Sequence, residues 1–276
     1  MRHFVRRADT ELGFAGVGEH TPGAALTAFD VRSLDPGGRI EPAVQSFEEC
    51  FYVLDGAPSL HTEWATVELR AGDYGLIPVG TPHAWRNERP ETARWASMRS
   101  PQPRARHGFD TYKVPLTIQA PPTNVDPRDP RMRFFGHIEP SQMDVGSVSM
   151  SSALLVYSGI AVKMMVDSNL GARLTTMFMV HYDPDGVAGA HDHPFEETYL
   201  FLEGEAEASF DGETYLLGPG DLAFAGAGCV HAFRNAGSGP LRWLETQAPQ
   251  PPSRHAYRFV HDWAYLRSIT GEGKGD

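Results

Sequence analysis

The sequence has little cysteine, no long apolar run and fewer basic than acidic residues. Two cysteines among 276 residues argue against a disulfide framework and favour a reducing compartment. No segment approaches the roughly 18 apolar residues that cross a bilayer, so no membrane role is expected. A net charge of -11 without a clustered basic surface argues against nucleic-acid binding. The basic N-terminus lacks a following apolar core, which predicts no signal peptide and a cytoplasmic location.

Helical periodicity is also nearly absent. Short segments suited to β-strands recur instead, with Gly, Pro and Asp between them, for example at residues 175–182, 197–202, 206–210 and 214–217. The sequence Asp183-Pro184-Asp185-Gly186 predicts a turn, and Asp211-Gly212 predicts a hairpin. This pattern predicts an all-β protein built as a sandwich or small barrel.

The chain carries one domain twice. Residues 23–97 recur as residues 171–245 at a constant offset of 148, with 23 of 75 positions identical. Between the copies lies a stretch rich in Pro, Arg and Asp. We therefore divide the chain into an N-terminal domain (1–100), a connector (101–145) and a C-terminal domain (146–270).

The second copy contains a set of side chains typical of a metal site. His191 and His193 share one face of a strand because side chains alternate along it, and Glu197 has the same parity. His231 follows 38 residues after His193, on an expected neighbouring antiparallel strand. Three imidazoles and a carboxylate converging inside a barrel suit a divalent first-row metal.

These residues resemble the two motifs of the cupin family. The first is His191-x-His193-x3-Glu197-x6-Gly204, and the second is Gly220-x5-Gly226-x-Gly228-x2-His231-x3-Asn235. The resemblance extends to both copies and implies a bicupin, with two double-stranded β-helix (jelly-roll) barrels in tandem. By position it implies one divalent metal, Fe(II), Mn(II), Ni(II) or Zn(II), on His191, His193, Glu197 and His231.

The first copy differs at the paired-histidine positions. It retains Glu49 and His83 but has Ala43 and Gln45 opposite His191 and His193. We interpret Gln45, Glu49 and His83 as a degenerate site in a metal-free barrel that serves packing or dimerisation, with Glu49 and His83 forming an internal ion pair. Weak metal binding there is the alternative.

Strand parity also predicts the residues around the metal. An apolar pocket for an aromatic or otherwise hydrophobic substrate is expected from Met177, Met179, His181, Tyr199, Phe201, Phe233 and Trp243. Each of these side chains could equally be ordinary barrel core. Glu196 is expected to point away from the face of Glu197. Cys229, two residues before His231, is either oxidation-prone or a small buried filler.

The leading functional hypothesis is a mononuclear Fe(II) or Mn(II) dioxygenase that combines O2 with a small aromatic or oxygen-rich substrate. Glu197 would be a metal ligand or a general base. The bicupin layout resembles quercetin-type and gentisate-type dioxygenases.

Two alternatives belong to other classes. One is a redox-neutral hydrolase, decarboxylase or isomerase, similar to the ureidoglycine aminohydrolase bicupins, with the metal as Lewis acid. The other is a cupin that binds a small ligand without turnover. The bicupin resemblance and exposed barrel edges are compatible with a homodimer.

Overall fold

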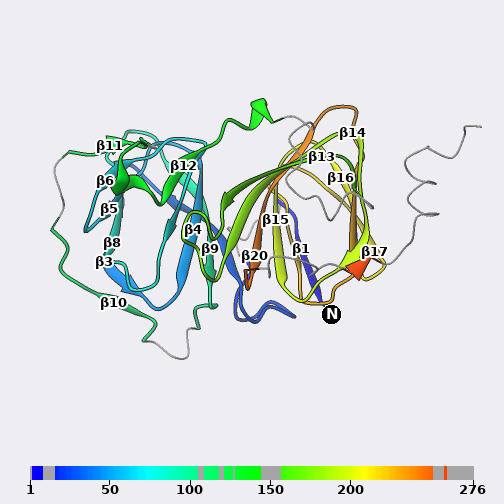
Figure 1. Ribbon diagram of the computed structural model, residues 1–276, viewed down its shortest axis with the longest axis horizontal. Coiled ribbons are helices and arrows are strands. Elements are labelled where there is room, and N and C mark those ends of the chain that lie inside the picture. The colour runs from blue at the N-terminus through cyan, green and yellow to red at the C-terminus, as the bar shows by residue number, and fades with distance from the viewer. Residues whose placement is uncertain are drawn as a thin grey trace, which may run out of the picture.

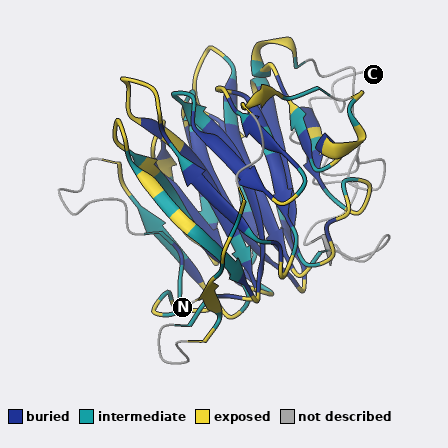
Figure 2. Ribbon diagram, turned by 90° about the vertical axis from the view of Figure 1, so that its left-hand side faces the viewer, coloured by how far each residue is buried: buried dark blue, intermediate teal, exposed yellow. Residues whose placement is uncertain are grey.

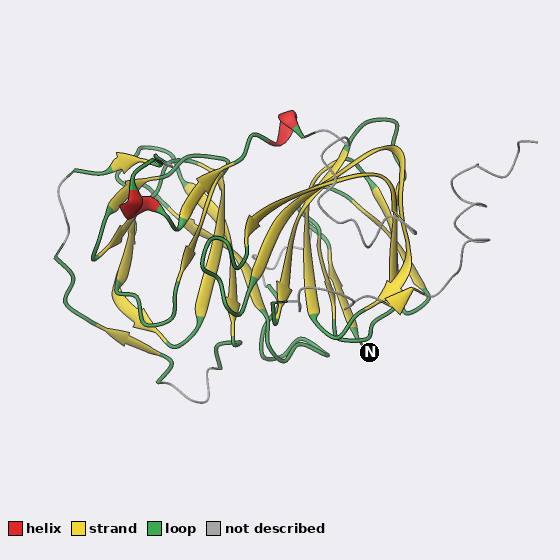
Figure 3. Ribbon diagram, in the orientation of Figure 1, coloured by secondary structure: helices red, strands yellow, loops and turns green. Residues whose placement is uncertain are grey.

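The computed structural model shows two β-barrels lying side by side (Figure 1). It describes residues 2–8, 16–104, 109–117, 121–126, 128–143 and 157–250, together with the backbone of 258–259. This confirms the predicted all-β fold of two tandem jelly-roll barrels. The described helices are two short 3-10 turns, η1 (Pro130–Met132) and η2 (Pro140–Gln142), drawn red in Figure 3. Within the described residues, no helix has the length and apolar character to cross a membrane.

The first barrel consists of a five-stranded sheet, β12-β7-β4-β9-β2, facing a six-stranded sheet, β10-β3-β8-β5-β6-β11. Its strands are β2 (Ala28–Leu34), β3 (Arg39–Gln45), β4 (Glu48–Asp55), β5 (Ser59–Thr62), β6 (Thr66–Glu68), β7 (Asp73–Ile77), β8 (His83–Arg86), β9 (Ala93–Ser100), β10 (Thr111–Lys113), β11 (Thr123–Asn124) and β12 (Phe135–His137). Most of its strand residues are buried, and its exposed residues lie in the turns and along the outer strands (Figure 2).

The second barrel is one continuous, curled sheet in the order β1-β18-β15-β20-β14-β19-β16-β17, with β13 and β21 also paired to β14. Its strands are β1 (His3–Arg6), β13 (Tyr157–Val166), β14 (Thr176–Asp192), β15 (Glu196–Glu203), β16 (Ala206–Phe210), β17 (Glu213–Leu217), β18 (Leu222–Ala225), β19 (His231–Asn235), β20 (Leu241–Ala248) and β21 (Arg258–Phe259).

The long strand β14 departs from the sequence prediction. The expected turn at residues 183–186 lies within β14, where the pairing with β13 shifts from Tyr182 opposite Ile160 to Val187 opposite Ser158. Asp185 adopts a φ of 65° there. The four turn-forming residues therefore bulge out while the strand continues to His191.

The boundaries of the two barrels differ from the domain ranges proposed from sequence. β1, within the proposed range 1–100, pairs with β18 of the second barrel (Figure 1). β10, β11 and β12, within the proposed connector 101–145, extend the sheets of the first barrel. Both segments lie outside the repeat, so the repeat gives no information on where they pair.

Equivalent strands of the two copies have the same register. Ala43 pairs with His83 in the first barrel as His191 pairs with His231 in the second. Glu49 lies opposite Arg99, as Glu197 lies opposite Gln247. The 148-residue offset therefore holds in three dimensions, and the two sites can be compared position by position.

Three apolar clusters hold the molecule together. One fills the first barrel around Trp85 and Trp95, and another fills the second barrel around Tyr199 and Trp243. The third contains side chains of both barrels, including Met98 and Met177, and lies between them. The sheets that meet at this interface are consequently apolar on both faces.

Candidate metal centre

Three histidines converge at one end of the second barrel. His191 is the penultimate residue of β14, His193 directly follows this strand, and His231 begins β19 opposite His191. One ring nitrogen from each lies within 4.8 Å of the others, and all three residues are at most 3% exposed. The ring centroids of His191 and His231 are 4.3 Å apart.

Backbone carbonyls fix the orientation of all three rings. His191 Nδ1 lies 2.7 Å from the carbonyl oxygen of Gly189, His193 Nδ1 lies 2.9 Å from that of Phe195, and His231 Nδ1 lies 3.0 Å from that of Cys229. A carbonyl only accepts, so each Nδ1 carries a proton, and in the neutral ring the electron pair is on Nε2. Carbonyl bonds of this kind orient the histidine ligands of metals. The donor set therefore fits a divalent first-row metal.

Glu197 lies among the Nε2 atoms. Its Oε2 is 2.8 Å from His193 Nε2 and 3.3 Å from His231 Nε2. The Gln247 amide donates to Oε1 at 2.6 Å, and the Tyr199 hydroxyl donates to Oε2. The carboxylate is thereby held facing the histidines, in reach of an ion that they bind.

The charges of the cluster follow from burial and proximity. Burial alone would raise the pKa of Glu197, but His193 and His231 lower it well below its usual range. Burial, reinforced by His231, lowers the pKa of His191 to about 3. Burial and the neighbouring Glu197 raise the pKa of Glu245 well above its usual range. Burial alone would lower the pKa of His193, but the Glu197 carboxylate raises it. Because a carboxylate and a neutral imidazole are the forms that bind metals, a metal would displace the proton that His193 shares with Glu197.

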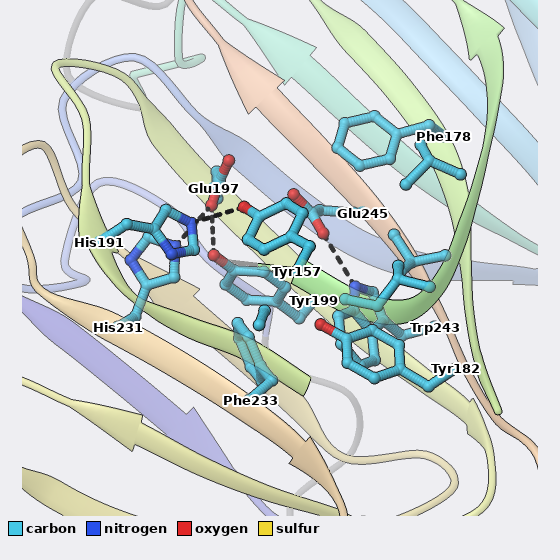
Figure 4. A pocket seen from close by; sticks show the side chains of 14 residues that line it. Tyr157, Phe178, Tyr182, His191, Glu197, Tyr199, His231, Phe233, Trp243 and Glu245 are labelled. Atoms are coloured by element: carbon cyan, nitrogen blue, oxygen red, sulfur yellow. Dashed lines mark hydrogen bonds and ion pairs between the residues drawn. The ribbon is translucent and has the colours of Figure 1, made fainter. Parts of the chain in front are cut away.

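A cavity adjoins the cluster, and aromatic side chains form much of its wall (Figure 4). Its volume for water-sized molecules is about 30 Å³. It is lined by Tyr157, Ile160, Val162, Phe178, Val180, Tyr182, Ala188, His191, Glu197, Tyr199, His231, Phe233, Trp243 and Glu245. Tyr157 reaches the cluster from β13, with its hydroxyl 2.9 Å from His191 Nε2.

Only some of the pocket residues predicted from sequence line the cavity. Tyr199, Phe233 and Trp243 line the cavity, whereas Phe201 packs in the barrel core without lining it. Met177 and Met179 face the cluster between the barrels. His181 contacts Asp183 and Arg242, also away from the cavity.

The expected orientation of β14 was therefore wrong, because Phe178, Val180 and Tyr182 are the residues that face the cavity. Both faces of this strand are apolar, so alternation could not distinguish the barrel interior from the interface. β13 was missed for a different reason: it precedes the repeated segment, so the comparison of copies did not include it. Glu245 shares the parity of Trp243 on β20, and it lines the cavity as that parity predicts.

An internal hydrogen-bond network occupies the corresponding place in the first barrel. The Gln45 amide nitrogen lies 2.9 Å from Glu49 Oε2 and 3.2 Å from His83 Nε2. Arg32 is the first-barrel residue equivalent to Val180 in the repeat, and its guanidinium lies 3.4 Å from Glu49 Oε1. The ion-pair partner of Glu49 is thus Arg32 rather than the expected His83. Gln45 lies between His83 and Glu49 and contacts both.

The charge of Arg32 affects the protonation of Glu49. Burial alone would raise the pKa of Glu49, but Arg32 and the other nearby cations lower it to about 2. A guanidinium therefore neutralises the carboxylate in the first barrel, where a metal cation would do so in the second.

Comparison with known proteins connects both barrels to one family. The profile of the Cupin_2 family, described as a cupin domain, matches residues 31–99 and 178–246. Quercetin 2,3-dioxygenase from Bacillus subtilis (strain 168) is 26% identical over 212 residues, which are 67% of this chain and 62% of that protein. The match thus spans less than two thirds of the length of that relative.

Solved structures of other proteins have the same fold as this chain. Salicylate 1,2-dioxygenase from Pseudaminobacter salicylatoxidans has a TM-score of 0.65 at 13% identity, over 85% of this chain and 76% of that one. A deletion variant of Bacillus subtilis oxalate decarboxylase has a TM-score of 0.63 at 17% identity, over 95% and 79%. The chain therefore belongs to the cupin family, with two cupin domains in tandem.

Proposed function

We propose that the second barrel binds one divalent first-row metal through His191, His193 and His231, and that the chain is a mononuclear dioxygenase acting on a small aromatic or oxygen-rich substrate. The observation that carries the proposal is the carbonyl bond at each Nδ1, which directs three Nε2 electron pairs into one buried space. When bound, an Fe(II) or Mn(II) ion would supply a Lewis-acidic redox centre with exchangeable positions.

The protein's own groups would position and deprotonate the substrate. Glu197 serves as a fourth ligand or accepts the proton of a substrate hydroxyl, and Gln247 and Tyr199 fix its orientation. The rings of Phe233 and Trp243, 4.9 Å apart, offer flat apolar surfaces to an aromatic substrate. These walls also exclude water from the reacting groups.

The size of the cavity adds a constraint. A volume of about 30 Å³ is about a fifth of the roughly 150 Å³ of an apolar cavity that binds benzene. An aromatic substrate therefore requires side chains of the wall to move. Tyr157 is only partly buried, unlike the histidine that it contacts, and it is the wall residue that we expect to move.

The relatives support a catalytic role and are compatible with two reaction classes, oxidation by O2 and redox-neutral chemistry. Two of the similar proteins are named as dioxygenases and one as a decarboxylase. The alternative to the oxidative reaction is accordingly redox-neutral chemistry, in which Glu197 moves a proton and O2 is not consumed.

Metal analysis followed by oxygen uptake tests the proposal. The purified chain is analysed for Fe, Mn, Ni and Zn, reconstituted with each, and assayed with catechols, gentisate, salicylate, flavonols, ureides and oxalate. We expect Fe- or Mn-dependent O2 consumption with a phenolic substrate. The H191A/H193A variant should lose its equivalent of Fe or Mn and the activity, whereas the matched first-barrel variant H83A should keep both.

Two outcomes contradict the proposal in different ways. Retention of full Fe or Mn occupancy by H191A/H193A rules out the site assignment. Turnover of a substrate without oxygen uptake rules out the dioxygenase and favours the redox-neutral alternative.

A further inference from the structure

A second group of metal-binding side chains lies where β1 joins the second barrel. His3 comes from β1, Asp211 from the turn between β16 and β17, and Cys229 from the loop before β19. One potential ligand atom from each lies within 4.8 Å of the others. Among the described residues, this is the one such group besides the three histidines of the candidate metal centre.

The His3 ring has a buried nitrogen without a hydrogen-bond partner. His3 is 3% exposed, and its Nε2 lies 2.9 Å from the Tyr215 hydroxyl, whereas its Nδ1 has no partner. The ring stacks on Phe210 at a centroid distance of 5.6 Å, which restricts its rotation. A buried nitrogen without a partner destabilises the folded state, and coordination of a cation would remove this penalty.

The Asp211 carboxylate supplies negative charge at the same place. It accepts from Arg2 Nε and a terminal Arg2 nitrogen at 3.0 and 2.9 Å, and from the Val230 N–H at 3.1 Å. A carboxylate offers about four lone-pair positions, so one can still bind a cation. Arg2 is about half exposed and also donates to the Gly228 carbonyl, so it must give up these bonds and turn outward when a second cation arrives.

We propose that His3, Asp211 and Cys229 form a second metal site, for a thiophilic divalent cation such as Zn²⁺, which fastens β1 to the second barrel. Nitrogen, oxygen and sulfur ligands together suit zinc. Binding replaces the thiol proton of Cys229 by the metal, and that proton is released to solvent.

The geometry requires only a small contraction. Ligand atoms around a tetrahedral zinc ion are about 3.5 Å apart. The present separations are within 4.8 Å, so none has to shorten by more than about 1.3 Å. Asp211 is in a hairpin turn and can provide much of this movement. A water molecule would complete the tetrahedral coordination.

The site would act on stability rather than on chemistry. It would join residue 3 to residues 211 and 229, and so close a loop that spans most of the chain. A ligand that binds only the folded state raises its stability as the free ligand concentration exceeds the dissociation constant. The proposal is independent of the proposed dioxygenase function, because it uses none of the ligands of the first metal.

Cobalt spectroscopy in the full-length H191A/H193A background tests the site separately from the three-histidine cluster. Titration with Co²⁺ under reducing, anaerobic conditions should give one bound equivalent and a near-ultraviolet thiolate-to-cobalt charge-transfer band, which Zn²⁺ abolishes by competition. The C229S substitution should remove the band. The matched substitution C50S should retain it, because Cys50 is buried elsewhere.

The H3Q substitution provides a second test that does not depend on the fold of the cysteine variant. β1 is an edge strand, so H3Q should leave the barrel intact while weakening Co²⁺ binding at least about tenfold. It should also abolish the rise in melting temperature that Zn²⁺ produces in the parent. Absence of the band in the parent, its persistence in C229S, or unchanged binding by H3Q each overturns the proposal.

Discussion

Glu48 and Glu196, which are 148 positions apart, make the same contacts across the interface between the barrels. Each carboxylate accepts hydrogen bonds from three consecutive backbone N–H groups that precede a strand of the opposite barrel: Glu48 from Arg173, Leu174 and Thr175, and Glu196 from Ala25, Leu26 and Thr27. Both glutamates are nearly fully buried. The duplicated domain thus associates with its own copy through a pair of reciprocal anchors.

Neutralising either anchor should destabilise the association of the barrels. Glu48→Gln removes the charge but keeps one acceptor oxygen, and bonds to charged groups contribute about 1.5–3 kcal/mol. We expect a loss of about 2 kcal/mol in the free energy of unfolding, measured by urea denaturation, and a similar loss for Glu196→Gln. The exposed control Glu88→Gln should change it by less than about 0.5 kcal/mol. Unfolding of Glu48→Gln at the wild-type urea concentration would contradict the anchor role.

The sequence was informative wherever the repeat and the ligand spacing applied. Identical residues at a constant offset predicted two barrels of one kind, and the His-x-His spacing with its distant histidine predicted the side chains that the structure brings together. These features are local or periodic, so strand geometry alone fixes their relative positions.

The remaining features depend on tertiary packing that no pattern in one sequence encodes. The two faces of β14 carry equally apolar residues, so Met179 and Val180 could not be assigned to interface and cavity. β1 pairs with the edge of the second barrel at β18. The equivalent edge of the first barrel, at β7, is paired with β12 instead, and the sequence does not indicate which of the two similar edges β1 joins. The role of Glu196 required knowledge of how the barrels meet.

Breaking the ion pair of the first barrel should be costly, whereas replacing both partners should not. Arg32→Met leaves Glu49 buried beside Gln45 without its counter-charge, and removal of one partner of a buried pair costs about 3 kcal/mol or more. The double variant R32M/E49Q should recover most of this loss, because no uncompensated charge is left. Chemical denaturation of the two single variants and the double variant measures the coupling. Additive losses in the double variant would contradict the pairing.

The same pair should make the protein sensitive to acid. The pKa of Glu49 is lowered in the folded state from an ordinary 4.5 to about 2, so its contribution is fully present above pH 4.5 and is lost as the pH falls towards 2. The shift corresponds to about 3 kcal/mol. In R32M/E49Q this part of the acid dependence should disappear, as followed by the free energy of unfolding between pH 5 and about 2. An unchanged slope over that interval would assign the acid sensitivity to other groups.

Removing the hydroxyl of Tyr157 should strengthen metal binding. Because His191 Nδ1 donates to a carbonyl, the Tyr157 hydroxyl must donate to Nε2, the atom that would bind the metal. A metal therefore competes with a hydrogen bond worth about 1 kcal/mol, and Tyr157→Phe should raise the affinity about fivefold. Competition with a chelating dye measures this, with Tyr182→Phe as the control that lines the same cavity without touching a histidine. Weaker binding by Tyr157→Phe would mean that the hydroxyl supports the metal site.

A metal site should be recoverable in the first barrel by three substitutions. Ala43→His and Gln45→His restore the paired histidines beside Glu49 and His83, and the shared register places them as in the second barrel. Arg32→Val, which copies Val180, removes the guanidinium that now neutralises Glu49. The triple variant should bind one Mn²⁺ more than the wild-type protein, measured by equilibrium dialysis with elemental analysis. The double variant A43H/Q45H, which keeps Arg32, should not, since a buried cation beside the carboxylate repels a second one. If the double variant binds the additional ion as tightly as the triple variant, then the missing histidines alone, and not the charge of Arg32, account for the lost site.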